Sequence, residues 1–294
     1  MKQPLSRRRC TILILLFLTA DSLNTDLARG GPLGWLLCIA AAILAIPAGR
    51  IFLRGMLWLK ETEKRTVQQL GGVFLFAFAL WTFVRMVVDF GSFIRTYNDF
   101  ALSPTVICLL MAATSFYLAR LHGHGLARTA ELLFWPIAAI LVWTFFVGLR
   151  ACDFGRLLPL RFSGSLMGLG WLFLRVFAQN LLVLALLCRE AEPAPLRTAM
   201  RDSTLLTGLA LGAFLAKDIA QAGWTLARGY TYPLYALAGL SRTGTGMHIE
   251  DLLICALLAS RLIKGALLLR LMLGILKAAS HNVTWTGKQD VSSP

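Results

Sequence analysis

The chain has 294 residues, of which 57% are hydrophobic and 15% charged, with a mean hydropathy of +0.68. These values lie far from the usage of soluble globular proteins, and they exclude disordered, collagen-like and disulfide-scaffold classes. The net charge of +14 comes from Lys and Arg residues set singly or in short clusters between apolar runs. Juxtamembrane positive charge has this pattern, so we expect an integral membrane protein in the lipid bilayer, with no nucleic-acid partner.

A bilayer core about 30 Å thick needs roughly 20 apolar residues per helix. On that measure the sequence predicts an all-α, polytopic bundle of about eight transmembrane helices within a membrane domain at 11–275. A basic N-terminus (1–10) precedes the domain, and a disordered cytoplasmic tail (276–294) follows it. The predicted spans are 11–28, 32–53, 67–94, 102–120, 129–149, 165–188, 203–227 and 250–275.

The first span has an alternative interpretation, because three arginines precede an apolar run, as in a cleaved signal peptide. The seven further spans favour an uncleaved helix. Most Lys and Arg residues outside the spans lie on the side of the N-terminus, so the positive-inside rule places both termini in the cytoplasm. The connections at 54–66 and 189–202 are then short charged cytoplasmic segments rather than domains.

Polar residues interrupt the first span at Asp21, Ser22, Asn24, Thr25 and Asp26. Such residues disfavour a helix interior and favour caps. One interpretation is a broken transmembrane helix, whose exposed backbone groups bind substrate charges or ions in transporters. The other is a loop that has already reached the outer surface.

Ionisable residues within spans are expensive and usually face a bundle interior, a cavity or a partner. Arg85 and Asp89 in the third span are spaced i, i+4, which predicts an ion pair on one helical face. In the sixth span Arg175, Gln179 and Asn180 fall on adjoining positions after Gly164, Gly168 and Gly170. The glycines permit unwinding or close packing, and the combination favours a polar cavity.

The last two spans are less informative. Lys217, Asp218 and Gln221 in the seventh are compatible with a local pair, an interhelical bond or a transport role. The eighth begins with His248, Glu250 and Asp251, acids that suit a helix N-terminus, and continues through Arg261 and Lys264.

Motifs that carry chemistry are missing from the sequence. It has no Walker loop, GxGxxG, HExxH, CxxC or GxSxG, and His122 and His124 lack further ligands in their glycine-rich loop. We therefore predict no catalytic residue, metal site or cofactor, and we expect a protein that is not an enzyme.

The order of several weak motifs resembles a known family, the spore germination permeases, which are the B subunits of nutrient germinant receptors in the amino acid/polyamine/organocation transporter superfamily. Residues 89–94 (DFGSFI) resemble the stretch that ends the family's third helix, and residues 102–105 (LSPT) stand at its Leu-Pro-x-Thr-Pro. The resemblance runs from about 11 to 275, and its further motifs are Arg128–Glu131 with Pro136, Arg156–Pro159, Tyr232–Tyr235 and His248–Glu250, with Lys264 further along.

The resemblance implies two inverted helical repeats, a nutrient such as an amino acid as ligand, and A-type and C-type receptor subunits as partners in a bacterial cell membrane or spore inner membrane. Two departures stand out. The family has ten helices where this sequence predicts eight, and Asn180 and His248 stand where the family usually has an acidic residue and an arginine.

Three functions follow as expectations. The first is a sensor that triggers germination when a nutrient binds between the interrupted first and sixth spans, at Asp21, Ser22, Asn24, Thr25, Phe177, Gln179 and Asn180. The second is a proton-coupled amino acid transporter with the same cavity. The third is a degenerate structural membrane subunit whose charges only pair. Residues for ion coupling or structural ion pairs are Asp26, Arg85, Asp89, Glu250 and Lys264.

Overall fold

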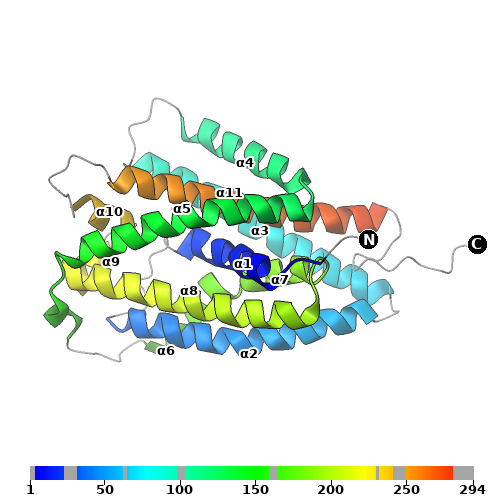
Figure 1. Cartoon of the computed structure of the whole chain (residues 1–294), viewed down its shortest axis with the longest axis horizontal. Helices are drawn as coiled ribbons and strands as arrows, with labels where there is room; N and C mark the ends of the chain where they lie inside the picture. The colour runs from blue at the N-terminus through cyan, green and yellow to red at the C-terminus, as the bar shows by residue number, and fades with distance from the viewer. Residues whose placement is uncertain are drawn as a thin grey trace, which may run out of the picture.

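The computed structural model describes residues 4–22, 32–61, 65–97, 103–158, 165–229, 232–240 and 249–280. Every element in these ranges is helical, which confirms the predicted all-α class. In chain order (Figure 1) the elements are α1 (Arg7–Ser22), α2 (Gly34–Glu61), α3 (Arg65–Tyr97), α4 (Pro104–Arg120), α5 (Gly123–Leu149), the 3-10 helix η2 (Phe154–Leu157), α6 (Ser165–Leu172), the π-helix η3 (Phe173–Phe177), α7 (Asn180–Leu187), α8 (Pro193–Ala222), α9 (Trp224–Gly229), α10 (Pro233–Leu240) and α11 (Ile249–Ser280).

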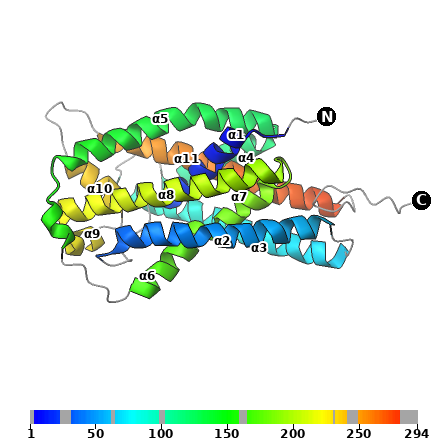
Figure 2. The same ribbon diagram turned by 60° about the horizontal axis from the view of Figure 1, so that its bottom comes forward.

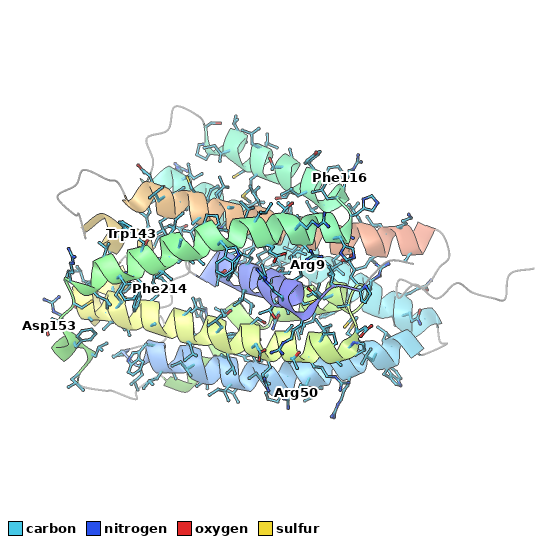
Figure 3. The ribbon with its side chains drawn as sticks, viewed as in Figure 1. Arg9, Arg50, Phe116, Trp143, Asp153 and Phe214 are labelled. Atoms are coloured by element: carbon cyan, nitrogen blue, oxygen red, sulfur yellow. The ribbon has the colours of Figure 1, made fainter. Side chains whose placement is uncertain are left out.

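Among the described residues, five helices are long and apolar enough to cross a membrane: Gly34–Leu59, Thr66–Thr96, Gly123–Leu149, Pro193–Ala222 and Asp251–Ala279. Helix α4 is apolar but shorter, with 17 residues. The outer faces carry large apolar side chains, such as Phe116 on α4 and Trp143 on α5 (Figure 3). The chain is therefore an integral membrane protein, and the number of eight spans stays a prediction.

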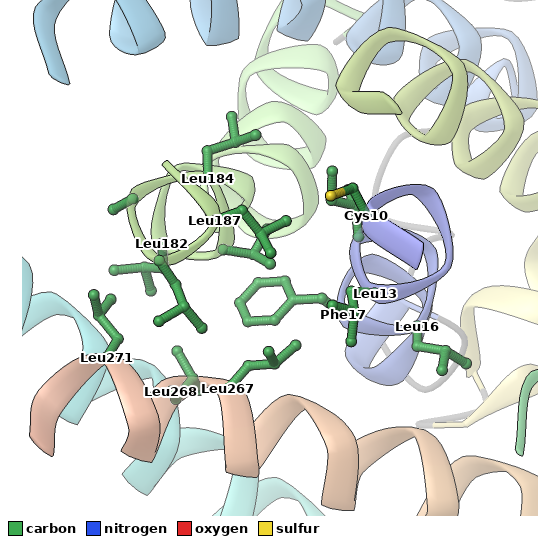
Figure 4. Close-up of a cluster of buried hydrophobic side chains, with 14 of the residues drawn as sticks. Cys10, Leu13, Leu16, Phe17, Leu182, Leu184, Leu187, Leu267, Leu268 and Leu271 are labelled. Carbon is green, nitrogen blue, oxygen red and sulfur yellow. The ribbon is translucent and has the colours of Figure 1, made fainter. Parts of the chain in front are cut away.

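Helix α1 runs through the middle of the bundle, where it packs against α5, α7, α8 and α11 (Figures 1 and 2). Its residues from Ile12 to Leu18 are apolar on every side, and all are buried. A helix that is hydrophobic all round belongs in an interior. Figure 4 shows Phe17 pointing from α1 into the space between α7 and α11, among leucines of both helices.

Three arginines hold the first turn of α1 to its neighbours. Arg7 pairs with Asp202 of α8 at 2.5 Å, and Arg8 and Arg9 lie 3.0 and 3.5 Å from the carboxylate of Glu131 on α5. These pairs are partly exposed, so each contributes little alone. Together they fix where the central helix enters the bundle, at the end predicted to face the cytoplasm.

Close packing of small residues joins α2 to α8. Gly208 and Gly212 are spaced as in GxxxG, a pattern that lets helix backbones approach closely. A Cβ at Gly212 would lie 2.7 Å from the carbonyl oxygen of Trp35, and one at Gly208 would clash with Cβ of Ala42. The backbone approach therefore requires glycine at both positions.

Two predicted connections and the predicted tail are shorter than expected. Helix α2 continues to Glu61 through the proposed 54–66 connection, and α8 begins at Pro193, inside the proposed 189–202 connection. Helix α11 continues to Ser280, so 276–280 do not belong to a disordered tail. Proline is favourable at the first position of a helix, and charged residues extend a helix beyond a membrane without breaking it. The predicted helix ends were therefore wrong where charged residues were taken as the start of a connection.

Candidate functional site

The sixth predicted span is interrupted near its polar residues, whereas Gly168 and Gly170 lie in the regular helix before the interruption. Helix α6 ends at Leu172, the π-helix η3 follows, and residues 178–179 form a turn before α7 begins at Asn180. The N–H of Ala178 donates to the carbonyl oxygen of Phe173 at 2.9 Å, which is the i to i+5 bond of a π-turn. Single π-turns inside helices occur frequently at functional sites. We refer to residues 173–180 as the break.

Gln179 connects the break to α11. Its Oε1 accepts a hydrogen bond from Nζ of Lys264, a lysine that is only 1% exposed. The same ammonium lies 4.8 Å from the ring centroid of Phe17 on α1, within the range of a cation–π interaction. Lys264 therefore joins three segments, α1, the break and α11, at one point.

Arg261 lies three residues before Lys264 on α11 and is also 1% exposed. Its Nε donates to the carbonyl oxygen of Ala20, in the last described turn of α1, at 3.2 Å. Its guanidinium carbon lies 5.0 Å from the ring centroid of Phe90 on α3. Two buried cations thus face α1 from adjacent turns of one helix, and we call Arg261 and Lys264 the cation pair.

Asn180 faces another way. Its Nδ2 donates to Oγ1 of Thr204 on α8 at 3.1 Å, and both residues are buried. Asn180 and Phe177 also line a crevice of about 280 Å³ between α2 and the break. The three residues predicted for substrate binding in this span therefore separate, with Gln179 at the cation pair and the other two at the crevice.

The first-span residues fall at the limit of the described chain. Asp21 and Ser22 belong to the last described turn of α1, but their side chains are outside the described part, and so is the side chain of Glu250 at the start of α11. Asn24, Thr25 and Asp26 lie outside the described residues altogether. Their roles in binding or ion coupling stay predictions.

The predicted Arg85–Asp89 pair is present, with Nε and Oδ2 3.9 Å apart on a partly exposed face of α3. The hydroxyl of Tyr232 donates to the carbonyl oxygen of Asp89 at 3.1 Å, and the ring of Tyr232 meets that of Phe93 edge to face. The Arg85–Asp89 pair is thus local to α3, and it is Tyr232, the residue before α10, that joins α3 to α10.

A second pair of buried charges lies towards the other end of α8. Lys217 Nζ is 3.0 Å from Oδ1 of Asp218, and both side chains are at most 5% exposed. Gln221 donates to the carbonyl oxygen of Gly148 at 2.8 Å, so this end of α8 is tied to the end of α5. Asp153 follows α5 and is labelled at this end of the bundle in Figure 3. Its backbone N–H donates to the carbonyl oxygen of Ala220 on α8, which adds a second contact between the two segments.

Sequence reasoning noted Arg261 but gave it no role. Two cations at i, i+3 within an apolar helix are a signal for a buried site, because each is costly unless it meets a partner or a ligand. The GxxxG spacing of Gly208 and Gly212 was a second signal in the sequence, and it indicates close helix packing. The contact of Arg261 with Ala20 could not be predicted from the sequence, since the two residues are 241 positions apart.

Comparison with known proteins gives no match, whether with family models, curated proteins or solved structures. The fold and the site together define the class of protein. In its described residues it is an all-helical integral membrane protein with one interrupted helix and with Arg261 and Lys264 buried near its centre. The resemblance to the germination permeases stays a prediction.

Proposed function

We propose that this chain binds a small carboxylate-bearing nutrient, such as an amino acid, beside the cation pair, and that it acts as a nutrient-sensing membrane subunit of the spore germination permease type. The observation that carries the proposal is that Arg261 and Lys264 both contact the last described turns of α1, while Gln179 of the break is hydrogen-bonded to Lys264. The partners expected from the resemblance are A-type and C-type receptor subunits.

The chemistry of the cation pair fits a carboxylate. A guanidinium presents several N–H donors in a fixed plane and an ammonium adds a point charge, so the two together recognise an anionic group strongly. Both lie at membrane depth, where the low dielectric strengthens electrostatic attraction. The amide of Gln179 adds a neutral polar group that can orient the rest of the ligand.

Binding at this point gives a route to a conformational signal. The ligand would contact α11 and the break at the same time, and α1 packs against both. A ligand shifts a conformational equilibrium only by its difference in affinity between the two states. Because a π-turn is a weak point in a helix, the break is the element whose two arrangements would differ in affinity.

The test is a thermal-shift screen of the purified protein in lipid nanodiscs against a panel of amino acids, sugars and nucleosides. A ligand that binds only the folded form raises the apparent melting temperature by mass action. We expect a shift with an amino acid, lost in Lys264→Met and retained in the matched control Lys277→Met near the end of the same helix. A shift that survives Lys264→Met would contradict the proposal.

A second candidate function is proton-coupled transport of the same ligand. It is favoured by one observation, the burial of a titratable lysine directly at the break, because intramembrane ionisable residues mark ion and substrate pathways. Uptake of the labelled ligand into proteoliposomes separates the two functions. Binding without uptake supports the sensor, uptake driven by a pH gradient supports the transporter, and the absence of both supports a structural subunit.

A further inference from the structure

Four exposed arginines lie beside the contact between α2 and α8, at the end of the bundle where the N-terminus enters. Arg50 and Arg54 are spaced i, i+4 on α2, and Arg197 and Arg201 have the same spacing on α8. Residues at this spacing share one face of a helix, so each helix presents a basic pair there. We call these four residues the arginine patch.

The positions at which the two helices touch are known. Helices α2 and α8 are antiparallel neighbours (Figure 1). A Cβ at Gly49 would lie 2.5 Å from Sδ of Met200, so these two positions face each other. One turn nearer the end, Leu53 and Leu196 are both buried and line the same small crevice.

The two basic pairs lie on the same side of this contact. Each arginine follows a contact residue by one position, and one step along a helix turns by about 100°. Because the helices are antiparallel, that step leads to the same side on both. The arginines therefore form two rungs, about 5.4 Å apart along the helices. The rungs are Arg50 with Arg201 and Arg54 with Arg197.

The arginine patch carries more positive charge than its neighbours neutralise. The carboxylate of Asp202 is shared between Arg201 and Arg7, which lie 3.0 and 2.5 Å from it. The other three arginines of the patch form no ion pair within the described part of the chain. All four are exposed, so an anion at the membrane surface can reach them.

Apolar side chains continue the same two rows towards the middle of the membrane. On α8 the i, i+4 row passes from Arg201 to Leu205 and Leu209, and on α2 Ile43 lies two turns from Arg50. Ile43 is 55% exposed and Leu209 is 53% exposed. The surface therefore changes from basic to apolar along the helices, as a lipid changes from headgroup to acyl chains.

We propose that this surface binds an anionic phospholipid from the leaflet on the side of the N-terminus. The arginine patch holds the phosphodiester, and the acyl chains lie along Ile43, Leu205 and Leu209. Guanidinium groups suit a phosphate because they present N–H donors in a planar fork. A zwitterionic lipid adds a cationic group that the unneutralised arginines repel, and a soluble anion gains nothing from the apolar rows. The site does not involve the break or the cation pair, so it is independent of nutrient binding.

The experiment uses two photoreactive lipids in phosphatidylcholine nanodiscs. One is phosphatidylglycerol and the other phosphatidylcholine, each with the same diazirine in one acyl chain, and labelled peptides are mapped by mass spectrometry. We expect the phosphatidylglycerol probe to label residues 36–47 and 205–212 at least about fivefold more than the phosphatidylcholine probe. Unlabelled phosphatidylglycerol should compete, and its deacylated headgroup, glycerophosphoglycerol, should not.

Matched variants test the arginines. Replacing Arg54 and Arg197 together with glutamine removes one complete rung, and labelling by phosphatidylglycerol should fall to the level of phosphatidylcholine. The control replaces Arg120 and Arg128, two exposed arginines of α4 and α5 at the same end of the bundle, and should keep the preference. Phosphatidylcholine labelling of α3 reports folding, and it should be the same in both variants and in the wild type.

Three results would overturn the lipid site. Equal labelling of the two segments by both probes would show that the surface does not select charge. A preference that survives in the Arg54 and Arg197 variant would place the anion elsewhere. Displacement by glycerophosphoglycerol would show that the patch binds a soluble anion and that the apolar rows have no part in recognition.

Discussion

Arg261 Nε donates to the carbonyl oxygen of Ala20, 3.2 Å away, although 241 positions separate the two residues. The bond joins the last described turn of the central helix α1 to the middle of α11. It places a permanent positive charge one helical turn from Lys264, and both side chains are 1% exposed. Among the described side chains, two basic groups therefore lie at the point where α1, the break and α11 meet.

Replacing Arg261 with methionine should weaken ligand binding and leave the protein folded. The variant keeps an apolar stem of similar length and removes a buried charge, so we expect a folded protein that elutes as the wild type does. Loss of a charge-assisted hydrogen bond should lower nutrient affinity by at least about tenfold. Equilibrium binding of the labelled nutrient measures this, with Arg95→Met in the last turn of α3 as the control. Equal affinities in the two variants would be inconsistent with a role for Arg261.

A methyl group at Gly212 should destabilise the protein, because a Cβ there would lie 2.7 Å from a backbone oxygen of α2. Overpacking of this kind typically costs about 1–3 kcal/mol. Gly55→Ala is the matched control, since nothing lies within 4 Å of a Cβ at that position. Its expected effect is neutral or stabilising, by up to about 1 kcal/mol of helix propensity. Denaturant unfolding in mixed micelles compares the two; similar losses would argue against the close α2–α8 contact.

The buried pair of Lys217 and Asp218 should show strong coupling in a double-mutant cycle. Lys217→Met leaves a carboxylate that is 5% exposed without its partner, a change that costs about 3–5 kcal/mol. Adding Asp218→Leu removes the remaining charge, so we expect the double variant to be at least as stable as the wild type. Free energies of unfolding for the four proteins give the coupling. Additive effects would show that the two charges do not interact.

Cys10 should resist alkylation at neutral pH. The residue is fully buried beside the arginines of α1, and burial, reinforced by the charge of Glu190, raises the pKa of its thiol from 9.0 to about 11. The thiolate is the reactive form, so the labelling rate should keep rising with pH up to about 11, where an ordinary thiol levels off near 9. Maleimide labelling of a variant that retains only this cysteine measures the profile.

Glu131→Gln should then increase Cys10 labelling at pH 7.5, because it removes the carboxylate that pairs with Arg8 and Arg9. Asp153→Asn, at the far end of the bundle, serves as the control. Wild-type labelling as fast as that of a short cysteine peptide would show that the thiol is accessible and that the ion pairs do not close this end.

Hydropathy was sufficient to predict the all-α class and the five helices that are long enough to cross a membrane, because each transmembrane segment must satisfy its backbone internally and presents a long apolar run. The polar residues Gln179 and Asn180 marked the region of the break within an apolar span, whereas Gly168 and Gly170 before them lie in α6 and not in the break. Helix ends were misplaced where charged residues continued the helix, as at Pro193 and Glu61. Which side chains meet across the bundle depends on three-dimensional packing, so the pairing of Arg261 with α1 and of Gln179 with Lys264 required the structure.

The most direct test of a carboxylate site beside Lys264 is to compare the affinities of the nutrient amino acid and of its primary amide, in nanodiscs, for the wild type and for Lys264→Met. The amide keeps the size of the acid and lacks its charge. We predict that the wild type binds the acid at least about tenfold more tightly than the amide, and that Lys264→Met loses most of its affinity for the acid while its affinity for the amide changes little, so that the preference falls. Equal binding of acid and amide by the wild type would contradict the proposed site.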